Sequence, residues 1–171
     1  MKRSYSAALG GISAALSLVF LLAAIYSPAG KLALYALSSV PLLMPLRKGM
    51  YGTAALVYAA TGLLALLVSG NPLYVAPYWL LFGVHPLLIA LPERFKLNAV
   101  ITAAIKLIYF NLALLAAYKL SALFFIDLSA FENRFYGILA LAASAAFMVY
   151  DFLITRIYKK SDKYIDRIIR P

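Results

Sequence analysis

The feature that most constrains this chain is a series of apolar runs, each about as long as a helix needs to cross a membrane. About 20 mostly apolar residues in a helix span the hydrocarbon core of a bilayer. Runs bounded by charges or by Gly/Pro turns predict six such helices in 171 residues. Their expected bounds are 5–26, 32–46, 50–69, 73–91, 97–118 and 135–158. The second run is short and contains Pro41 and Pro45, so we expect a kinked helix there.

The composition supports this interpretation, because 65% of the residues are hydrophobic and only 13% are charged. We therefore expect an all-α fold, with residues 1–171 forming a single membrane domain. A cleavable signal peptide is the alternative for the first run, but that run is longer than a usual signal core and similar runs follow it. The chain has no cysteine, no phosphate-binding loop and no hydrolase motif, so we expect no enzyme activity, no cofactor and no bound metal.

The basic residues are divided unevenly between the two ends of the predicted helices. With the amino terminus inside, the inner side has twelve: Lys2, Arg3, Arg47, Lys48, Arg94, Lys96, Arg156, Lys159, Lys160, Lys163, Arg167 and Arg170. The outer side has three: Lys31, Lys119 and Arg134. Because Lys and Arg accumulate in cytoplasmic loops, this asymmetry predicts a multi-pass protein of the cell membrane with both termini in the cytoplasm. The net charge of +10 then reflects topology and lipid headgroups, and we expect no nucleic-acid partner.

Two segments outside the predicted helices have their own patterns. The outer stretch between Lys119 and Arg134 mixes aromatic residues with acids, which predicts a connector on the membrane surface or, alternatively, a cover over an opening. Residues 159–171 carry basic residues with apolar residues at helical spacing. This pattern predicts a basic amphipathic cytoplasmic tail that binds anionic lipid or docks on a cytoplasmic partner.

Charged residues inside the predicted helices are the strongest candidates for function, since a central Lys or Asp costs about 2.5 to 3.5 kcal/mol to insert. Lys106, Asp151 and the single histidine, His85, are expected roughly 14, 10 and 9 Å from the inner membrane surface. All three therefore lie near one level. An ion pair between Lys106 and Asp151 is either a structural latch between two helices or the polar floor of a ligand cavity. Asn111 is expected to line the same cavity or to bond a neighbouring helix.

In the ligand-cavity interpretation, the cavity opens to the outer face under aromatic residues. Its expected roof contains Tyr74, Tyr78 and Trp79, together with the loop at residues 124–125. Pro77 and Pro86 in the same predicted helix favour local unwinding, which turns backbone carbonyls toward a cavity.

The first helix carries two rows of small residues at intervals of four. One row is Ala7, Gly11 and Ala15, and the row beside it is Ser6, Gly10 and Ala14. Small residues at this spacing let another helix approach closely in a membrane. Two rows on one helix leave room for both an internal and an external partner.

Six helices in a chain of this length, inside termini, the small-residue row and a longer outer loop before the last helix together resemble the substrate-binding S components of energy-coupling-factor type ABC transporters. The resemblance implies that Ala7, Gly11 and Ala15 meet a transmembrane coupling subunit. It also implies a vitamin-like or metal-ion substrate captured from outside, with ATP used by separate ATPase subunits. The segments that begin at Lys31, Phe82, Lys106 and Val149 also look like a group of uncharacterised bacterial six-helix membrane proteins.

The sequence therefore supports one main hypothesis and two alternatives. The main hypothesis is a ligand-capturing membrane subunit, which predicts a cavity at the charged residues. The first alternative is a structural or scaffold protein of an envelope or cell-shape complex, which predicts a closed, filled bundle. The second is a self-sufficient carrier or channel, which needs a continuous polar path that these few polar residues hardly provide.

Overall fold

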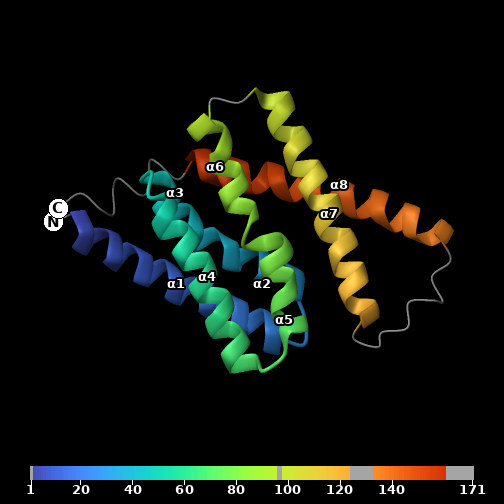
Figure 1. Ribbon diagram of the computed structural model, residues 1–171, viewed down its shortest axis with the longest axis horizontal. Coiled ribbons are helices and arrows are strands. Elements are labelled where there is room, and N and C mark those ends of the chain that lie inside the picture. Colours follow the sequence, from blue (N-terminus) through green and yellow to red (C-terminus); the bar gives the residue numbers. More distant parts are fainter. Residues whose placement is uncertain (1, 96–97, 124–132, 161–171) are drawn as a thin grey trace.

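The computed structural model describes residues 2–95, 98–123 and 133–160, and these residues form helices joined by short turns (Figure 1). In chain order, the elements are α1 (Lys2–Tyr26), α2 (Lys31–Ser39), η1 (Val40–Leu42), α3 (Leu43–Arg47), α4 (Tyr51–Ser69), α5 (Pro72–Pro77), η2 (Tyr78–Phe82), α6 (His85–Phe95), α7 (Ala99–Leu123) and α8 (Asn133–Lys160). This confirms the predicted all-α class. The outer stretch at residues 124–132 and the tail at 161–171 lie outside the described residues.

Five helical stretches of the described chain are long and apolar enough to cross a membrane. They are Ser4–Tyr26, Tyr51–Ser69, Pro72–Ala90, Val100–Ala117 and Leu141–Lys160. This is the pattern of a multi-pass membrane protein. The predicted second run is not among them, because it is divided into α2, the 3-10 turn η1 and α3. Pro41 lies in η1 and has no N–H to continue the α-helical bonding, so the interruption occurs where the sequence predicts a kink.

Tight turns connect successive helices in the first half of the chain. Gly30, Gly49 and Gly70 have φ angles of 70°, 69° and 64°, a conformation that favours glycine, and each lies between two helices. Asn71 then caps α5, because its side-chain oxygen accepts a hydrogen bond from the Leu73 N–H at 2.9 Å. These turns reverse the chain within a few residues.

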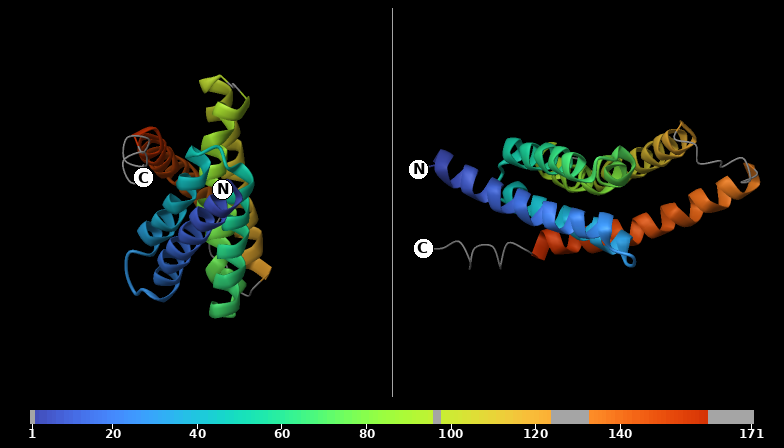
Figure 2. Two further views of the ribbon diagram at one scale, coloured as in Figure 1. Left: turned by 90° about the vertical axis from the view of Figure 1, so that its left-hand side faces the viewer. Right: turned by 90° about the horizontal axis from the view of Figure 1, so that it is seen from below.

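The helices form two layers that cross each other, as the two views of Figure 2 show. Helices α1, α2 and α8 lie in one layer, and α4, α5, α6 and α7 lie in the other. Two apolar clusters join the layers. The first contains Leu21, Ala24, Ile25, Tyr35, Ala65, Val75 and Tyr78, and the second contains Leu43, Leu46, Ala54, Ile89, Ala90, Ile154 and Tyr158.

The helix from Pro72 to Phe95 is discontinuous. Between α5 and α6, the segment η2 is π-helical, and prolines at 77 and 86 remove two backbone donors. Tyrosine hydroxyls from neighbouring helices donate to carbonyls of this segment. Tyr58 on α4 bonds the Trp79 carbonyl at 2.9 Å, and Tyr109 on α7 bonds the Leu80 carbonyl at 2.7 Å. The predicted unwinding is present, and these two carbonyls accept hydrogen bonds from tyrosine hydroxyls.

Candidate functional site

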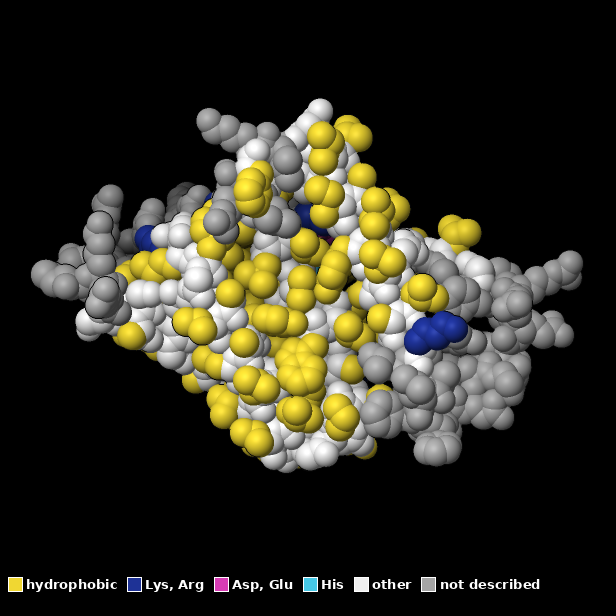
Figure 3. Space-filling model, in the orientation of Figure 1, with side chains coloured by type: hydrophobic (Ala, Val, Ile, Leu, Met, Phe, Trp, Pro, Cys, Tyr) yellow, Lys and Arg dark blue, Asp and Glu magenta, His cyan; other side chains and the backbone are white. Residues whose placement is uncertain are grey.

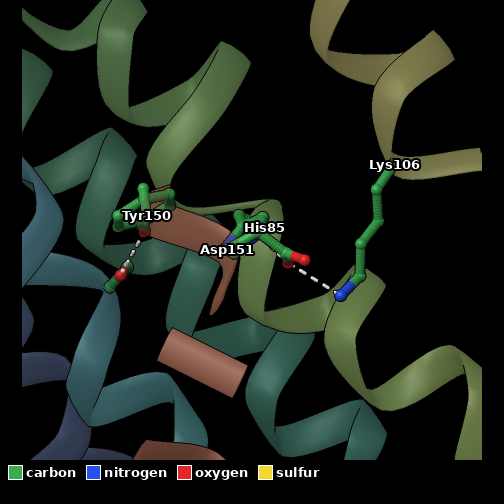
Figure 4. Close-up of polar contacts among 5 residues, drawn as sticks. His85, Lys106, Tyr150 and Asp151 are labelled. Atoms are coloured by element: carbon green, nitrogen blue, oxygen red, sulfur yellow. Dashed lines mark hydrogen bonds and ion pairs between the residues drawn. The ribbon is translucent and has the colours of Figure 1, made fainter. Parts of the chain in front are cut away.

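Asp151 accepts hydrogen bonds from two side chains through one carboxylate oxygen (Figure 4). The Lys106 Nζ lies 2.7 Å from Asp151 Oδ1, and the His85 Nε2 lies 2.8 Å from the same atom. The three residues come from α7, α8 and the first residue of α6. The predicted pair of Lys106 and Asp151 is therefore present, and His85 joins it on the level that helix geometry predicts.

His85 is held by aromatic side chains of α8. Its ring lies 4.7 Å from the Tyr150 ring and 5.3 Å from the Phe147 ring, measured between centroids. The Tyr150 hydroxyl lies 3.0 Å from the Ser39 hydroxyl on α2, so this contact joins α8 to α2 behind the site. This packing holds the imidazole with its Nε2 against the carboxylate.

The contacts indicate which nitrogen of His85 carries its proton. Nδ1 is buried without a hydrogen-bond partner among the described residues, while Nε2 faces Asp151. Burying an unprotonated ring nitrogen without a partner costs less free energy than burying an unpaired N–H of a charged imidazolium. We therefore assign the neutral tautomer with the proton on Nε2. Lys106 and Asp151 then neutralise each other, and the cluster of His85, Lys106 and Asp151 carries no net charge.

A cavity of about 440 Å³ lies beside the pair, between α6, α7 and α8. Its lining consists of Ile89, Pro92, Thr102, Ala103, Lys106, Leu107, Phe147, Met148, Asp151, Phe152, Thr155, Tyr158 and Lys159. In Figure 3, blue and magenta atoms are visible in a small hollow among yellow side chains. His85 does not line the cavity, and it is connected to the cavity wall through its hydrogen bond to Asp151.

The cavity lies on the other side of the charged pair from the expected roof. It follows α8 from Phe147 to Lys159 and reaches Pro92 near the end of α6 and Thr102 near the start of α7. The basic residues Arg94, Arg156, Lys159 and Lys160 belong to these ends of α6 and α8. The expectation of a cavity open toward Tyr74, Tyr78 and Trp79 was therefore wrong for this cavity.

The aromatic residues of the expected roof have other contacts. Tyr78 is fully buried in the first apolar cluster, and Trp79 packs against Gly62 of α4, where a Cβ would lie 1.7 Å from its Nε1. Tyr74 is 48% exposed, and its carbonyl accepts a hydrogen bond from Tyr35. Tyr78 and Trp79 therefore belong to the apolar packing around α1, α2 and α4, and none of the three residues lines the cavity.

Asn111 is also separate from the charged pair. Its side-chain amide donates to the Leu107 carbonyl one turn back on α7, at 2.9 Å, and its side chain is exposed. It borders a shallow groove formed by α7 alone. The expectation that Asn111 shares the cavity of Lys106 was therefore wrong.

The two small-residue rows of α1 have different surroundings. Gly10 faces α4, because a Cβ there would lie 2.9 Å from Thr53 Cγ2, and Ser6 bonds the Thr53 hydroxyl at 2.6 Å. Ala7, Gly11 and Ala15 are exposed, and a Cβ on Gly11 would meet no atom within 4 Å among the described residues. One row therefore packs inside the fold, and the other is directed outward.

Several cavity residues were missed by sequence reasoning. Phe147 and Thr155 lie four residues before and after Asp151, and Thr102 lies four residues before Lys106. Residues four apart share one face of a helix. A search one helical turn before and after each intramembrane charge would have identified these residues.

Comparison with known proteins gives no assignment: no family model, no curated protein and no solved structure matches the chain.

Proposed function

We propose that this chain is the membrane-embedded substrate-binding subunit of a small-molecule uptake transporter that relies on separate ATPase and coupling subunits. The observation that carries the proposal is the cavity of about 440 Å³ with the Lys106–Asp151 pair in its wall. This volume lies in the range of small-molecule sites, about 300 to 1,000 Å³. A latch alone needs no open space beside it, and two charges inside a membrane protein generally mark a substrate or ion path.

We further propose six crossings with both termini in the cytoplasm. The ends of these helices lie at two sides of the molecule, where they contact one another. On one side, Tyr26 bonds the Val68 carbonyl at 3.3 Å. On the other, Ser6 lies against Thr53, and the Arg47 guanidinium lies 4.0 Å from the Tyr158 ring centroid. The broken segment from α2 to α3 joins these two sides, which supports a sixth crossing, and the basic residues favour the second side as the inner one.

The position of the cavity fits the release step of uptake. An uptake protein opens one site first to the outside and then to the inside. The cavity here extends toward the proposed inner side, where Lys159 and Pro92 border it. In this proposal, the structure is the inward-open form, and a different helix arrangement receives the substrate from outside.

The exposed row on α1 is the proposed contact with the coupling subunit. Ala7, Gly11 and Ala15 give a partner helix a flat surface for close approach. The fold itself makes no use of the missing side chain at Gly11. A small residue at position 11 lets a partner helix approach closely, whereas lipid packs equally well against larger apolar side chains.

A pull-down from native membranes in mild detergent tests this proposal. The tagged chain should recover a second multi-span protein together with ABC ATPases, and Gly11→Leu should lose both. Gly52→Leu is the matched control, because Gly52 is also an exposed helical glycine with open space at its Cβ. Recovery of the same proteins by Gly11→Leu would remove this face from the interface.

The same exposed row favours a second candidate function, a scaffold protein of an envelope or cell-shape complex. A scaffold uses its helix faces and has no need of the cavity. Recovery of envelope-assembly proteins in the pull-down, with partner binding unchanged when the cavity is filled by Met148→Trp, would favour this candidate.

A further inference from the structure

The rim of the α6–α7–α8 cavity is formed by side chains that face the membrane. Met148 and Phe152 line the cavity, yet they are 59% and 61% exposed. Both lie within the membrane-crossing stretch Leu141–Lys160. In this stretch an exposed apolar side chain contacts lipid, so the gap beside these residues opens sideways into the bilayer.

The wall of the cavity changes character along its length. Leu107, Phe147, Met148 and Phe152 make most of it apolar. The Lys106 Nζ and the Asp151 Oδ1 make the short contact between the two charged side chains. The same oxygen of Asp151 also accepts the hydrogen bond from His85 Nε2. The Asp151 side chain keeps 27% of its surface exposed, so its second oxygen, Oδ2, remains to accept a bond from a ligand. Lys106 keeps two of its three N–H groups for the same purpose.

The charge of the site limits which ligands it accepts. With a neutral His85, Lys106 and Asp151 sum to zero, and Lys159, the third charged residue of the lining, lies eight residues further along α8, near the end of that helix. An anionic ligand competes with Asp151 for Lys106, a cationic ligand competes with Lys106 for Asp151, and either one leaves a charge without its partner in a medium of low dielectric constant. A lipid acyl chain fits the apolar wall but leaves Oδ2 and the Lys106 N–H groups unpaired.

From these observations we propose the substrate class: a lipid-soluble molecule without net charge, with an apolar body and a head group that both donates and accepts hydrogen bonds. The body lies against Phe147 and Phe152. The head donates to Asp151 Oδ2 and accepts from Lys106 Nζ. The molecule reaches the cavity from the bilayer past Met148. This inference rests on the proposed function only in treating the cavity as a ligand site.

Four probes with one hydrocarbon body and different head groups test the class: phenylbutyramide, phenylbutyrate, phenylbutylammonium and butylbenzene. Binding of radiolabelled phenylbutyramide to the full chain in nanodiscs is measured by scintillation proximity, with the other three as competitors. We expect saturable binding of the amide. Each of the other three should compete about tenfold more weakly than the unlabelled amide, because each lacks or disturbs the paired hydrogen bonds.

Two variants assign the binding to this cavity. The double variant Lys106→Leu/Asp151→Leu keeps the apolar wall and leaves the net charge of the lining unchanged, and it should lose about tenfold in affinity for the amide. Met148→Trp fills the rim and should abolish binding. Val149→Trp is the matched control, because Val149 is 62% exposed on the same helix and is not part of the lining. It should bind as the unmodified chain does.

The outcomes separate the substrate class from the proposed function. If phenylbutyrate or phenylbutylammonium competes as well as the amide, the cavity is a ligand site and the neutral class is wrong. If butylbenzene competes equally and the double variant binds equally, the cavity is a groove for lipid chains. If none of the four probes binds saturably, the cavity is not a ligand site, and both proposals lose their support.

The membrane route is tested on the same protein. The chain has no cysteine, so a single nitroxide is readily placed by Met148→Cys or Lys159→Cys. In nanodiscs, we expect molecular oxygen, which partitions into lipid, to relax the label at 148 more than a water-soluble nickel chelate does. The label at 159 should show the reverse. Stronger relaxation at 148 by the nickel chelate would place water at the rim and overturn access from the bilayer.

Discussion

Asp151 holds the site together because one carboxylate oxygen serves both an ammonium and an imidazole group. Lys106 approaches from α7 at 2.7 Å, and His85 approaches from α6 at 2.8 Å. His85 is 1% exposed and Lys106 is 6% exposed, so water reaches neither freely. The three residues are consequently coupled, and removing one partner leaves a charge or a donor unpaired inside the membrane.

The first prediction concerns this coupling. Lys106→Leu leaves Asp151 without a countercharge, and we expect a loss of about 3 kcal/mol in the free energy of unfolding. Adding Asp151→Leu should restore part of it, because the second change removes the unpaired charge. Unfolding in mixed micelles of mild detergent and dodecyl sulfate measures both effects. A double variant no more stable than the weaker single variant would contradict the pair.

A second contact at the scale of single residues is the packing of Trp79 against Gly62. We expect Gly62→Ala to destabilise the protein by about 1 to 3 kcal/mol, because the added Cβ would overlap the indole ring. Gly52→Ala on the same helix has open space at its Cβ and should be neutral or slightly stabilising. Thermal midpoints of the two variants in detergent give the comparison. Equal midpoints would show that Trp79 moves aside at little cost.

At the scale of elements, the discontinuous helix is the most unusual part of the fold. A break in a membrane-crossing helix leaves carbonyls that water cannot reach, so other groups must bond them. Tyr58 and Tyr109 supply hydroxyls from the helices on either side. His85 stands directly after this break, so the tyrosines also determine where its imidazole lies.

The third prediction tests these hydroxyls. Tyr58→Phe and Tyr109→Phe should each cost about 1 to 2 kcal/mol in stability, because each leaves a carbonyl in apolar surroundings without its donor. The control is Tyr26→Phe, which removes a longer bond of 3.3 Å made by an exposed side chain, and we expect little change. Thermal unfolding in detergent is the measurement. A loss for Tyr26→Phe as large as the others would mean that the broken helix is not specially dependent on its tyrosines.

At the scale of the whole molecule, the number of crossings decides where the termini lie. Five crossings place the two ends of the chain on opposite sides of the membrane, and six place them on the same side. The segment that decides is the one from α2 to α3, which Pro41 interrupts.

The fourth prediction resolves this with single cysteines in a chain that has none of its own. Ala29→Cys precedes α2 and should react with an impermeant maleimide on intact cells. Lys48→Cys follows α3 and should react only after the membrane is permeabilised. Asn98→Cys, between α6 and α7, is the control for the proposed inner side. Labelling of positions 29 and 48 from the same side would exclude a crossing by this segment.

The sequence by itself determined the all-helical membrane class of the protein and the common level of three polar residues along their helices. Apolar runs of membrane length predict helices because a bilayer leaves the backbone few other ways to pair its polar groups. The constant rise of a helix then places His85, Lys106 and Asp151 on one level, and the structure brings these three together. Both results depend on distance along a helix axis, and that distance follows from the number of residues between two positions.

Only the tertiary structure decided which faces of the helices meet. It buries Tyr78 in the core, packs Trp79 on Gly62, directs Asn111 back to its own helix and places the cavity between α6, α7 and α8. The rotation of a membrane helix about its own axis is weakly encoded, because lipid accepts apolar side chains on every face. Contacts between residues far apart in the chain set that rotation, and they determine the position of the candidate site.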